Sequence, residues 1–418
     1  RIAMLTNLFH PVATGSSVHV RGLASALVAA GNDVIVITPR LTKQLPEFEV
    51  VDGVKTYRIP ALHLPKMQIA LNFPWLNWTF WPANIRRIGQ ILTDNAIDVI
   101  HVHNHMFDMA FTGAWLRRRR NIPLVVTLHT LIKHASAHYD FVLGAVDRLF
   151  LKNVVIDGAD VVIAPDKNMS NYAADRFNRN DAELITYGLD APEPADAAEV
   201  ERVRSEFGLA GKRVILSLGH VHAIRNRHEL IRAMPRIIER IPNVKLLVVG
   251  GIFDESPIRL ASELGISDHV VFAGAQPRER IGAFLAAADV EAHWLTQSDA
   301  ANTSPGIASM EAMNAGLAVV IVSPQDIYGP NLLRDGENVI VVNRDDIADI
   351  SSRLVSVLED PERARLIGKN ASAMCAERFS WPAIASQTLD AYRHAIEIEA
   401  LAHSSQDAAR ERAAWHGS

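Results

Sequence analysis

Residues Asn302 to Val320 read N-T-S-P-G-I-A-S-M-E-A-M-N-A-G-L-A-V-V, and this stretch decides the fold. Ser304 suits a helix N-cap, and Pro305 suits the first helical position, where a missing N–H costs nothing. Gly316 ends the predicted helix, and the apolar run that follows predicts a buried strand. A helix followed at once by a buried strand is typical of an α/β protein with a parallel sheet.

The start of this helix is a candidate anion site. Gly306 carries no side chain, so a ligand reaches the backbone there, and the free N–H groups of a helix start attract anions. Glu311 lies between one and two turns further along, where a carboxylate accepts hydrogen bonds from sugar hydroxyls. The stretch therefore suits a phosphorylated sugar. The alternative is a buried helix with a capping serine and an ion-paired Glu311.

Apolar runs and amphipathic segments alternate along the chain, which predicts doubly wound sheets. Strands are expected at residues 2–6, 34–38, 98–102, 124–128, 160–164, 213–218, 245–249, 269–272, 290–293, 317–322 and 338–342. Helices are expected at residues 18–30, 106–119, 142–156, 227–240, 257–264, 278–287, 305–315, 347–358 and 361–377, with a helical tail from residue 382.

A Pro/Ala-rich segment at residues 190–199 separates two sets of alternating elements. We therefore predict an α/β protein of two facing Rossmann-like domains, residues 1–190 and 191–380, with a cleft between them. Residues 381–418 are expected to form a helical tail that packs back on the first domain. Ligands of such sheets bind at the carboxyl ends of the strands.

Bulk composition excludes several classes of protein. The formal net charge of −5 over 418 residues gives no general attraction for nucleic acid. The lone Cys375 excludes an intrachain disulfide framework and any Cys-based zinc site, and it favours a reducing, cytoplasmic compartment. No run of 18 apolar residues predicts a membrane-spanning helix. The first loop lacks the G-x-G-x-x-G pattern of dinucleotide binding.

Several histidines lie near strand ends. His129 follows the strand at 124–128, where ligands bind, although a structural role is the plain alternative. His101, His103 and His105 resemble a metal cluster, but no cysteine or aspartate completes a ligand set. We therefore predict no metal site.

Loops of the second domain carry further candidates. His220 and Arg225 follow the strand at 213–218, and their positive charge would neutralise a diphosphate leaving group. Gly274 and Ala275 follow another strand, where backbone groups read a nucleobase. Solvated loops are the alternative for both.

Two stretches indicate an amphiphilic acceptor. Lys66, Trp75, Trp78 and Trp81 mix tryptophan with positive charge, which suits a membrane interface. The arginine run at residues 117–120 would attract anionic lipid. The alternatives are an aromatic cluster between elements and a solvated helix end.

Together these segments resemble the retaining glycosyltransferases of family 4, which have the GT-B fold. The resemblance covers nearly the whole chain. It comprises the opening loop with Gly15, D-V-I-H-V-H at 98–103, V-V-T-L-H-T at 125–130, G-A-D-V-V-I-A-P at 158–165, S-P-G-I-A-S-M-E-A-M-N-A-G at 304–316 and D-G-E-N at 335–338. Residues 127–139 are similar to a stretch of diacylglycerol-glycosylating members.

The resemblance implies a role for each matching position. His129 would lie near the donor sugar, and Glu311 matches the second glutamate of the E-x7-E motif, which holds the ribose. His129, Arg225 and His220 would be catalytic. The implied donor-binding residues are Gly15, Ser16, Gly219, Gly274, Ala275, Thr303, Ser304, Gly306, Ile307 and Glu311.

Three positions depart from the family pattern. Thr303 replaces the first glutamate of the motif, so the usual carboxylate contact to the donor sugar is missing. His220 and Arg225 stand for the family's arginine and lysine. Tyr187 opens the segment that usually reads N-G-V-D.

The sequence therefore predicts a metal-independent retaining hexosyltransferase without a cofactor. Its donor is expected to be a nucleotide sugar, most simply a UDP-sugar, and its acceptor a membrane lipid such as diacylglycerol. We expect a cytoplasmic protein bound peripherally to the inner face of the cytoplasmic membrane, without a nucleic-acid partner, and predict no oligomeric state. The alternatives are a soluble or polyprenyl-linked saccharide acceptor and a non-catalytic sugar-nucleotide-binding scaffold.

Overall fold

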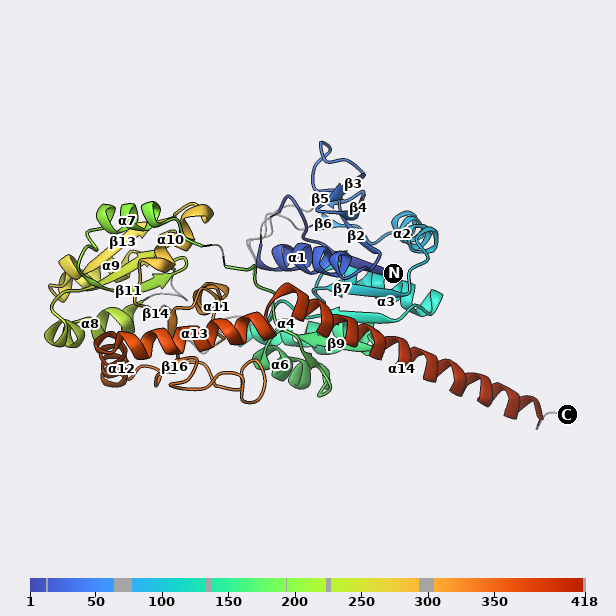
Figure 1. Ribbon diagram of the computed structural model, residues 1–418. Coiled ribbons are helices and arrows are strands. Elements are labelled where there is room, and N and C mark those ends of the chain that lie inside the picture. The colour runs from blue at the N-terminus through green and yellow to red at the C-terminus, as the bar shows by residue number, and fades with distance from the viewer. Residues whose placement is uncertain are drawn as a thin grey trace. The chain divides into compact units, whose positions relative to one another are not determined.

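The computed structural model describes residues 1–12, 14–63, 77–132, 137–192, 194–222, 227–292 and 304–415, with backbone alone at 137 and 405–415. The chain forms two compact units, which are coloured along the chain in Figure 1. Unit 1 comprises Arg1–Gly188 and Trp381–Ser418, and unit 2 comprises Leu189–Ser380. Each unit is a parallel sheet with helices on both faces, so the predicted α/β class is confirmed.

Unit 1 contains an eight-stranded sheet in the order β10-β9-β8-β7-β1-β2-β4-β3, parallel except for β3. Its strands are β1 (Ile2–Thr6), β2 (Val34–Pro39), β3 (Phe48–Val51), β4 (Val54–Ile59), β7 (Val99–His103), β8 (Leu124–Thr127), β9 (Val161–Ala164) and β10 (Glu183–Leu184). A small separate sheet pairs β5 (Leu62–His63) with β6 (Asn77–Trp78).

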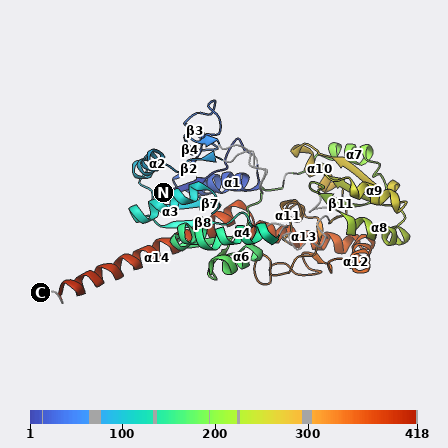
Figure 2. The same ribbon diagram turned by 180° about the vertical axis from the view of Figure 1, so that it is seen from behind.

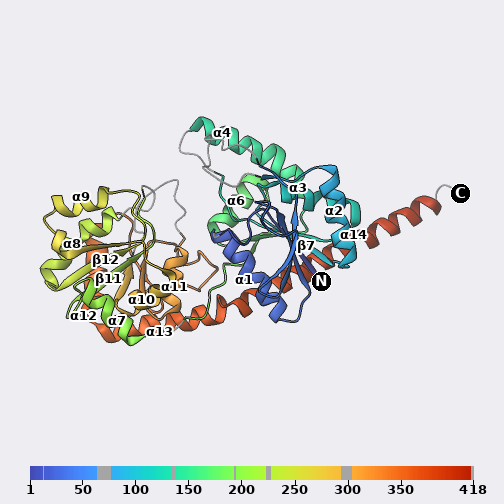
Figure 3. The same ribbon diagram turned by 90° about the horizontal axis from the view of Figure 1, so that it is seen from above.

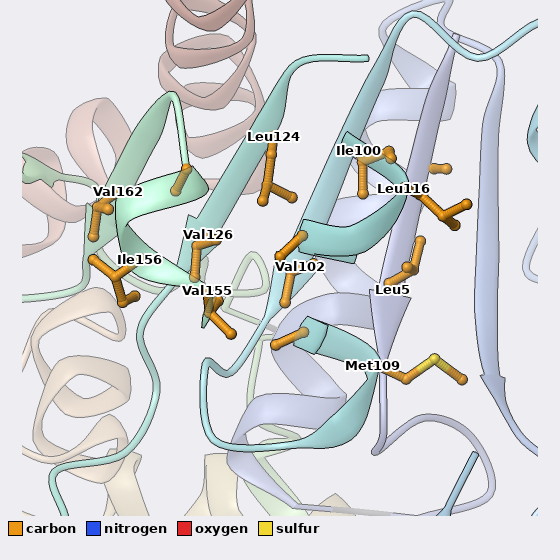
Figure 4. Packing of buried hydrophobic residues seen from close by; sticks show 14 of the residues in the cluster. Leu5, Ile100, Val102, Met109, Leu116, Leu124, Val126, Val155, Ile156 and Val162 are labelled. Carbon is orange, nitrogen blue, oxygen red and sulfur yellow. The ribbon is translucent and has the colours of Figure 1, made fainter. Parts of the chain in front are cut away.

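The helices of unit 1 divide between the two faces of this sheet. They are α1 (Gly15–Ala29), α2 (Pro82–Asp94), α3 (Asp108–Arg120), α4 (Ala137–Val146), α5 (Lys152–Val154), α6 (Lys167–Phe177) and α14 (Trp381–Trp415), with a π-helical turn η1 (Asp147–Leu151) and a 3-10 turn η2 (Ile156–Gly158). Figure 4 shows the core of one face, where Ile100 and Val102 of β7 meet Met109 and Leu116 of α3. Because strand side chains alternate, Val99 points to the other core, which α1 and α14 cover.

Helix α14 returns the chain to unit 1. Its buried residues Ile384 and Tyr392 belong to the same core as α1. The Trp381 ring lies between two glycines, since a Cβ at Gly22 or Gly188 would come within 2.1 and 2.2 Å of it. In Figures 1 and 2 the later turns of α14 project away from the body of unit 1.

Unit 2 contains a six-stranded parallel sheet in the order β13-β12-β11-β14-β15-β16. Its strands are β11 (Arg213–Leu218), β12 (Val244–Val249), β13 (Val270–Gly274), β14 (Val290–Ala292), β15 (Ala318–Ile321) and β16 (Ile340–Val341). Its helices are α7 (Ala197–Glu206), α8 (His228–Arg240), α9 (Ser256–Glu263), α10 (Ile281–Ala286), α11 (Ile307–Asn314), α12 (Ile347–Glu359) and α13 (Pro361–Arg378), with 3-10 turns η3 (Ser267–His269) and η4 (Arg278–Arg280). The strands predicted at 2–6 and 213–218 are correct at both ends.

The predicted start of the decisive helix is wrong by two residues. Helix α11 begins at Ile307, its N-cap is Gly306, and no side chain caps it. The Tyr328 hydroxyl donates to the Pro305 carbonyl at 2.9 Å, while the first helical bond runs from the Met310 N–H to the Gly306 carbonyl. Pro305 is therefore held outside the helix, and Ser304 does not cap it.

Candidate active site

In unit 2 the strand order brings several predicted donor-binding residues to one edge of the sheet. Gly219 and His220 follow β11, and Gly274 is the last residue of β13, which is separated from β11 by β12. Helix α11 begins after β14, the neighbour of β11 on its other side. All of these are carboxyl ends of parallel strands, where α/β sheets bind ligands. Thr303 and Arg225 lie outside the described residues, so their predicted roles remain predictions.

The start of α11 offers backbone N–H groups to an anion. With Gly306 as N-cap, no side chain caps the helix, and the N–H groups of Ile307 and Ala308 lie ahead of the first helical hydrogen bond. Ser309 in this turn donates to the buried Glu291 carboxylate of β14 at 3.0 Å, which fixes the helix start against the sheet. Ile307 is 40% exposed, so the first turn is accessible. These features suit a phosphate group.

Glu311 forms an ion pair with Arg278 in this structure. The two Nη atoms of Arg278 lie 2.8 and 2.5 Å from the two carboxylate oxygens of Glu311. Glu311 is therefore ion-paired, as the alternative interpretation expected. The Arg278 side chain is 64% exposed, and an ion pair of this kind is weak in water. A groove of about 1550 Å³ runs beside this pair, but of the described donor-binding residues Glu311 alone lines it.

The ends of β11 and β12 are tied together. Val221 donates to the Gly251 carbonyl and Phe253 donates to the Val221 carbonyl, at 2.9 and 2.8 Å. The Gly251 N–H donates to Nδ1 of His220 at 2.9 Å, so a neutral His220 carries its proton on Nε2. Phe253 packs edge-on against this imidazole, with ring centroids 5.5 Å apart, and is 75% exposed.

Backbone contact between these two ends needs glycine at position 250. Gly250 has φ +148°, and a Cβ there would lie 2.3 Å from the Gly219 carbonyl oxygen. The sequence prediction missed Gly250 and Phe253. The G-G-I-F run directly after a buried strand was the available signal, since paired glycines at a strand end mark a close backbone approach.

In unit 1, Gly15 and Ser16 form the first turn of α1, three residues earlier than predicted. Thr14 caps this helix, and Thr14 and Ser17 exchange hydrogen bonds in a capping box. The cap uses the N–H of Ser17, which leaves the N–H groups of the two preceding residues for a ligand. A Cβ at Gly15 would meet nothing within 4 Å, so open space lies beside it.

His129 lies in a cluster of imidazoles. Its Nε2 is 3.1 Å from Nδ1 of His103, and its Nδ1 is 3.2 Å from the Tyr187 hydroxyl. The Tyr187 ring stacks on His129, with centroids 5.7 Å apart, and His19 of α1 packs edge-on against both. Nearby, His101 bonds Thr127 and the Tyr392 hydroxyl.

Burial and mutual repulsion keep these rings neutral. Burial, followed by the charges of neighbouring histidines, holds the pKa of His103 and of His129 well below the usual value. Burial lowers the pKa of His19 to about 4 and that of His101 to about 3. A neutral His129 with both nitrogens bonded inside the unit is suited to shape the site and is a poor proton donor.

The sequence prediction missed His19 and the use of Tyr187. His19 was placed in a predicted helix, whose position above the strand ends becomes visible only in the folded sheet. Among the described residues, no group of three or more His, Cys, Asp or Glu side chains could hold a metal ion.

The predicted membrane residues are only partly described. Trp78 is 37% exposed and Trp81 is the N-cap of α2, whereas Lys66 and Trp75 lie outside the described residues. The prediction for Arg117 is wrong, because Asp160 and Glu399 form ion pairs with it beneath α14. No helix in the described part of the chain has the length and apolar character to cross a membrane.

Comparison with known proteins identifies the class and then the family. Residues 14–215 match the family described as glycosyl transferase 4-like domain, and residues 199–374 match glycosyl transferases group 1. The chain therefore has the GT-B fold and is a nucleotide-sugar-dependent glycosyltransferase. It belongs to glycosyltransferase family 4.

Individual relatives agree with this assignment. The chain is 28% identical over 424 residues to a D-inositol 3-phosphate glycosyltransferase of Nocardia farcinica, covering 95% of this chain and 90% of that protein. It is 29% identical over 387 residues to a GDP-mannose-dependent alpha-(1-6)-phosphatidylinositol monomannoside mannosyltransferase of Mycolicibacterium smegmatis, covering 90% and 94%. The Anabaena protein HepE in complex with UDP has a similar fold, with a TM-score of 0.66, 19% identity, and coverage of 93% and 98%.

Replacement of Glu311 by alanine is expected to weaken UDP binding by about 10-fold or more, because hydrogen bonds to a charged group contribute about 1.5–3 kcal/mol. Titration calorimetry measures this directly. R278A removes the ion pair but keeps the carboxylate, so it should still bind UDP. E337A breaks a comparable surface pair with Arg334 and is the control. Unchanged affinity in E311A would contradict the ribose assignment.

Proposed function

We propose that this glycosyltransferase moves a hexose from a UDP-sugar, with retention of configuration, to the hydroxyl of a membrane lipid such as a diacylglycerol. The main support for a lipid acceptor is an exposed apolar surface on unit 1. The relative from Mycolicibacterium smegmatis, named for a phosphatidylinositol mannoside acceptor, supports the same class of acceptor.

This apolar surface is formed by one side of α4, which is labelled in Figure 3, and of η1, which follows it directly in the chain. Its residues recur at helical spacing and are exposed by 44% or more. They are Tyr139, Val142, Val146, Leu149 and Phe150, with Phe141 beside them, and we call this set the α4 surface. Phe141 and Leu149 are 76% and 75% exposed, and a contiguous apolar face of this kind indicates a binding site.

The α4 surface continues onto the aromatic residues that precede α2. Phe150 packs edge-on against Phe111 of α3, with centroids 5.4 Å apart, and Phe111 packs against Trp78 at 6.3 Å. Trp115, one turn after Phe111, is 43% exposed and lies under the Arg119 guanidinium at 5.1 Å. The predicted Trp78 segment and the α4 surface are therefore parts of one face.

The charges on this face favour an anionic bilayer as its partner. Arg118, Arg119 and Arg148 are exposed at its edge. The nearby acidic residues are neutralised or buried: Asp140 pairs with Arg176, Asp157 pairs with Lys152, and Asp147 accepts from the Tyr172 hydroxyl. Aromatic rings with basic side chains around them suit the headgroup region of a membrane.

The proposed reaction needs no enzymic nucleophile. The bond between the anomeric carbon and the diphosphate oxygen breaks, and the acceptor oxygen attacks from the face that the diphosphate leaves. The acceptor proton passes to the departing phosphate. The α11 start, His220 and Arg225 would stabilise the negative charge of the leaving group. Gly15 and Ser16 would contact the donor phosphates.

Mass-spectrometric detection of new glycolipid tests the proposal. Purified protein is incubated with diacylglycerol-containing liposomes and a panel of UDP-sugars, with GDP-mannose as a further donor. A glycolipid formed from one UDP-sugar is the expected result. Product on a soluble inositol phosphate or saccharide instead would overturn the lipid acceptor. Donor binding without any product would favour a sugar-nucleotide-binding scaffold.

Loss of the two most exposed side chains of the α4 surface is expected to abolish most membrane binding. The double variant F141S/L149S should partition at least about 10-fold more weakly into phosphatidylglycerol vesicles, because burying a large apolar side chain contributes about 1.5–3 kcal/mol. Co-sedimentation measures the partition, and UDP binding checks folding. F253S removes an equally exposed phenylalanine from unit 2 and is the matched control. If the double variant sediments with vesicles as well as the wild type does, the α4 surface is not the membrane-binding surface.

A further inference from the structure

Arg227 is a buried arginine directly behind Gly219 and His220, the two residues that follow β11 and that we call the β11 loop. It precedes α8 and is 1% exposed, so its guanidinium does not reach solvent. Its Nη2 donates to the Gly219 carbonyl at 2.7 Å, and its Nη1 donates to the His220 carbonyl at 2.8 Å. Its Nε donates to the hydroxyl of Ser217, which is itself fully buried, at 3.1 Å.

These three hydrogen bonds fix the direction of the loop. Carbonyl oxygens carry partial negative charge, and a loop that turned them toward a phosphate would repel it. Arg227 holds the carbonyls of Gly219 and His220 toward the interior. The Gly251 N–H holds Nδ1 of His220 at the same time, which leaves Nε2 as the donor available for a ligand.

Arg227 also places a permanent positive charge behind this loop. A guanidinium remains protonated at every accessible pH. Water screens a charge in the protein interior far less than a surface charge, so its field acts on an anion bound at the loop.

We infer that Arg227 is a positioning residue for the donor diphosphate, acting through the β11 loop and through its charge without touching the ligand. The inference rests on the proposed donor site. Arg227, which the sequence prediction did not single out, would thus be the reason that the β11 loop prefers a charged nucleotide to an uncharged nucleoside. An arginine with a purely structural role would affect the binding of UDP and of uridine alike, whereas a positioning residue for the diphosphate would affect UDP alone.

Calorimetric titration with UDP and with uridine tests the inference. R227M keeps the length of the side chain but removes its charge and donors. We expect it to bind UDP about 10-fold or more weakly and to bind uridine as the wild type does. R227K should recover most of the UDP affinity. R58M removes another fully buried arginine, which lies in unit 1 and pairs with Glu49, and should leave both affinities unchanged.

Equal weakening of UDP and uridine binding in R227M, or no weakening of either, would overturn the inference. Failure of the wild type to bind UDP would instead refute the donor site and the inference with it. If melting curves show that R227M does not fold, ¹⁵N spectra of the wild-type protein test the inference instead. UDP, but not uridine, should then shift the Arg227 Nε–H resonance, and a static resonance at saturation would overturn the inference.

Discussion

Acidification from pH 7.5 to pH 5 is expected to lower the free energy of unfolding of unit 1 by several kcal/mol. His19, His101, His103, His105 and His129 are held neutral, with pKa values of about 4 for His19 and about 3 for His101 and His105. An unfolded histidine has a pKa of about 6.5. Between these values the unfolded state binds more protons, so stability falls as pH drops below about 6.5. Each such histidine contributes about 1.4 kcal/mol per pH unit within this window.

Native-state hydrogen exchange measures this effect separately in each unit. Peptides from β7 and β8, which carry or adjoin the histidines, should exchange by progressively easier opening as the pH falls, after correction for intrinsic rates. Peptides from β11 and β12 of unit 2 serve as the internal control. H105Q should reduce the pH slope by one proton. An opening free energy that stays constant across this range would contradict the prediction.

Replacement of Asp108 by alanine is expected to destabilise unit 1 by about 3–5 kcal/mol. Asp108 is 4% exposed, and its carboxylate accepts from the Asn7 amide at 2.6 Å and the Thr79 hydroxyl at 2.7 Å. It also accepts from the N–H groups of Thr79 and Phe80. Removing a buried charged acceptor leaves several donors without a partner, and such losses are among the largest for single substitutions.

The same substitution should weaken vesicle binding, because Asp108 holds the segment that carries Trp78 and Phe80. Thermal melting and co-sedimentation measure the two effects on one preparation. D98A removes a surface carboxylate paired with Arg1 and should cost no more than about 1 kcal/mol, with vesicle binding unchanged. A D108A variant as stable as D98A would show that the buried network contributes little.

Long apolar strands were predictable because a parallel sheet buries both faces of its strands. The runs at 2–6 and 213–218 are mostly apolar, with Arg213 and Ser217 as the polar members of the second run, and no distant contact changes their assignment. The start of α11 was not predictable in this way. Ser304 and Pro305 carry the local signals of a helix start, but Tyr328, which is remote in the sequence, binds the Pro305 carbonyl.

The α4 surface shows a second limit of pattern reading. Residues 142–156 predict a helix, but the pattern alone does not say whether its apolar residues are buried. The spacing of apolar residues shows which of them lie on the same face of a helix. Whether water reaches that face depends on which other elements pack against it. The structure leaves Phe141 and Leu149 uncovered, and it joins them to Trp78 through Phe111, which belongs to a different helix.

The sequence by itself determined the α/β class, the two sets of strands and the family, since these follow from local apolar patterns and ordered motifs. Only the tertiary structure placed Arg227 behind the Gly219–His220 loop and His19 beside His129. It also paired Glu311 with Arg278 and exposed the α4 surface. The physical reason is that hydrogen bonds, ion pairs and burial depend on which strand ends become neighbours, and the order of strands in a sheet is not the order in the chain.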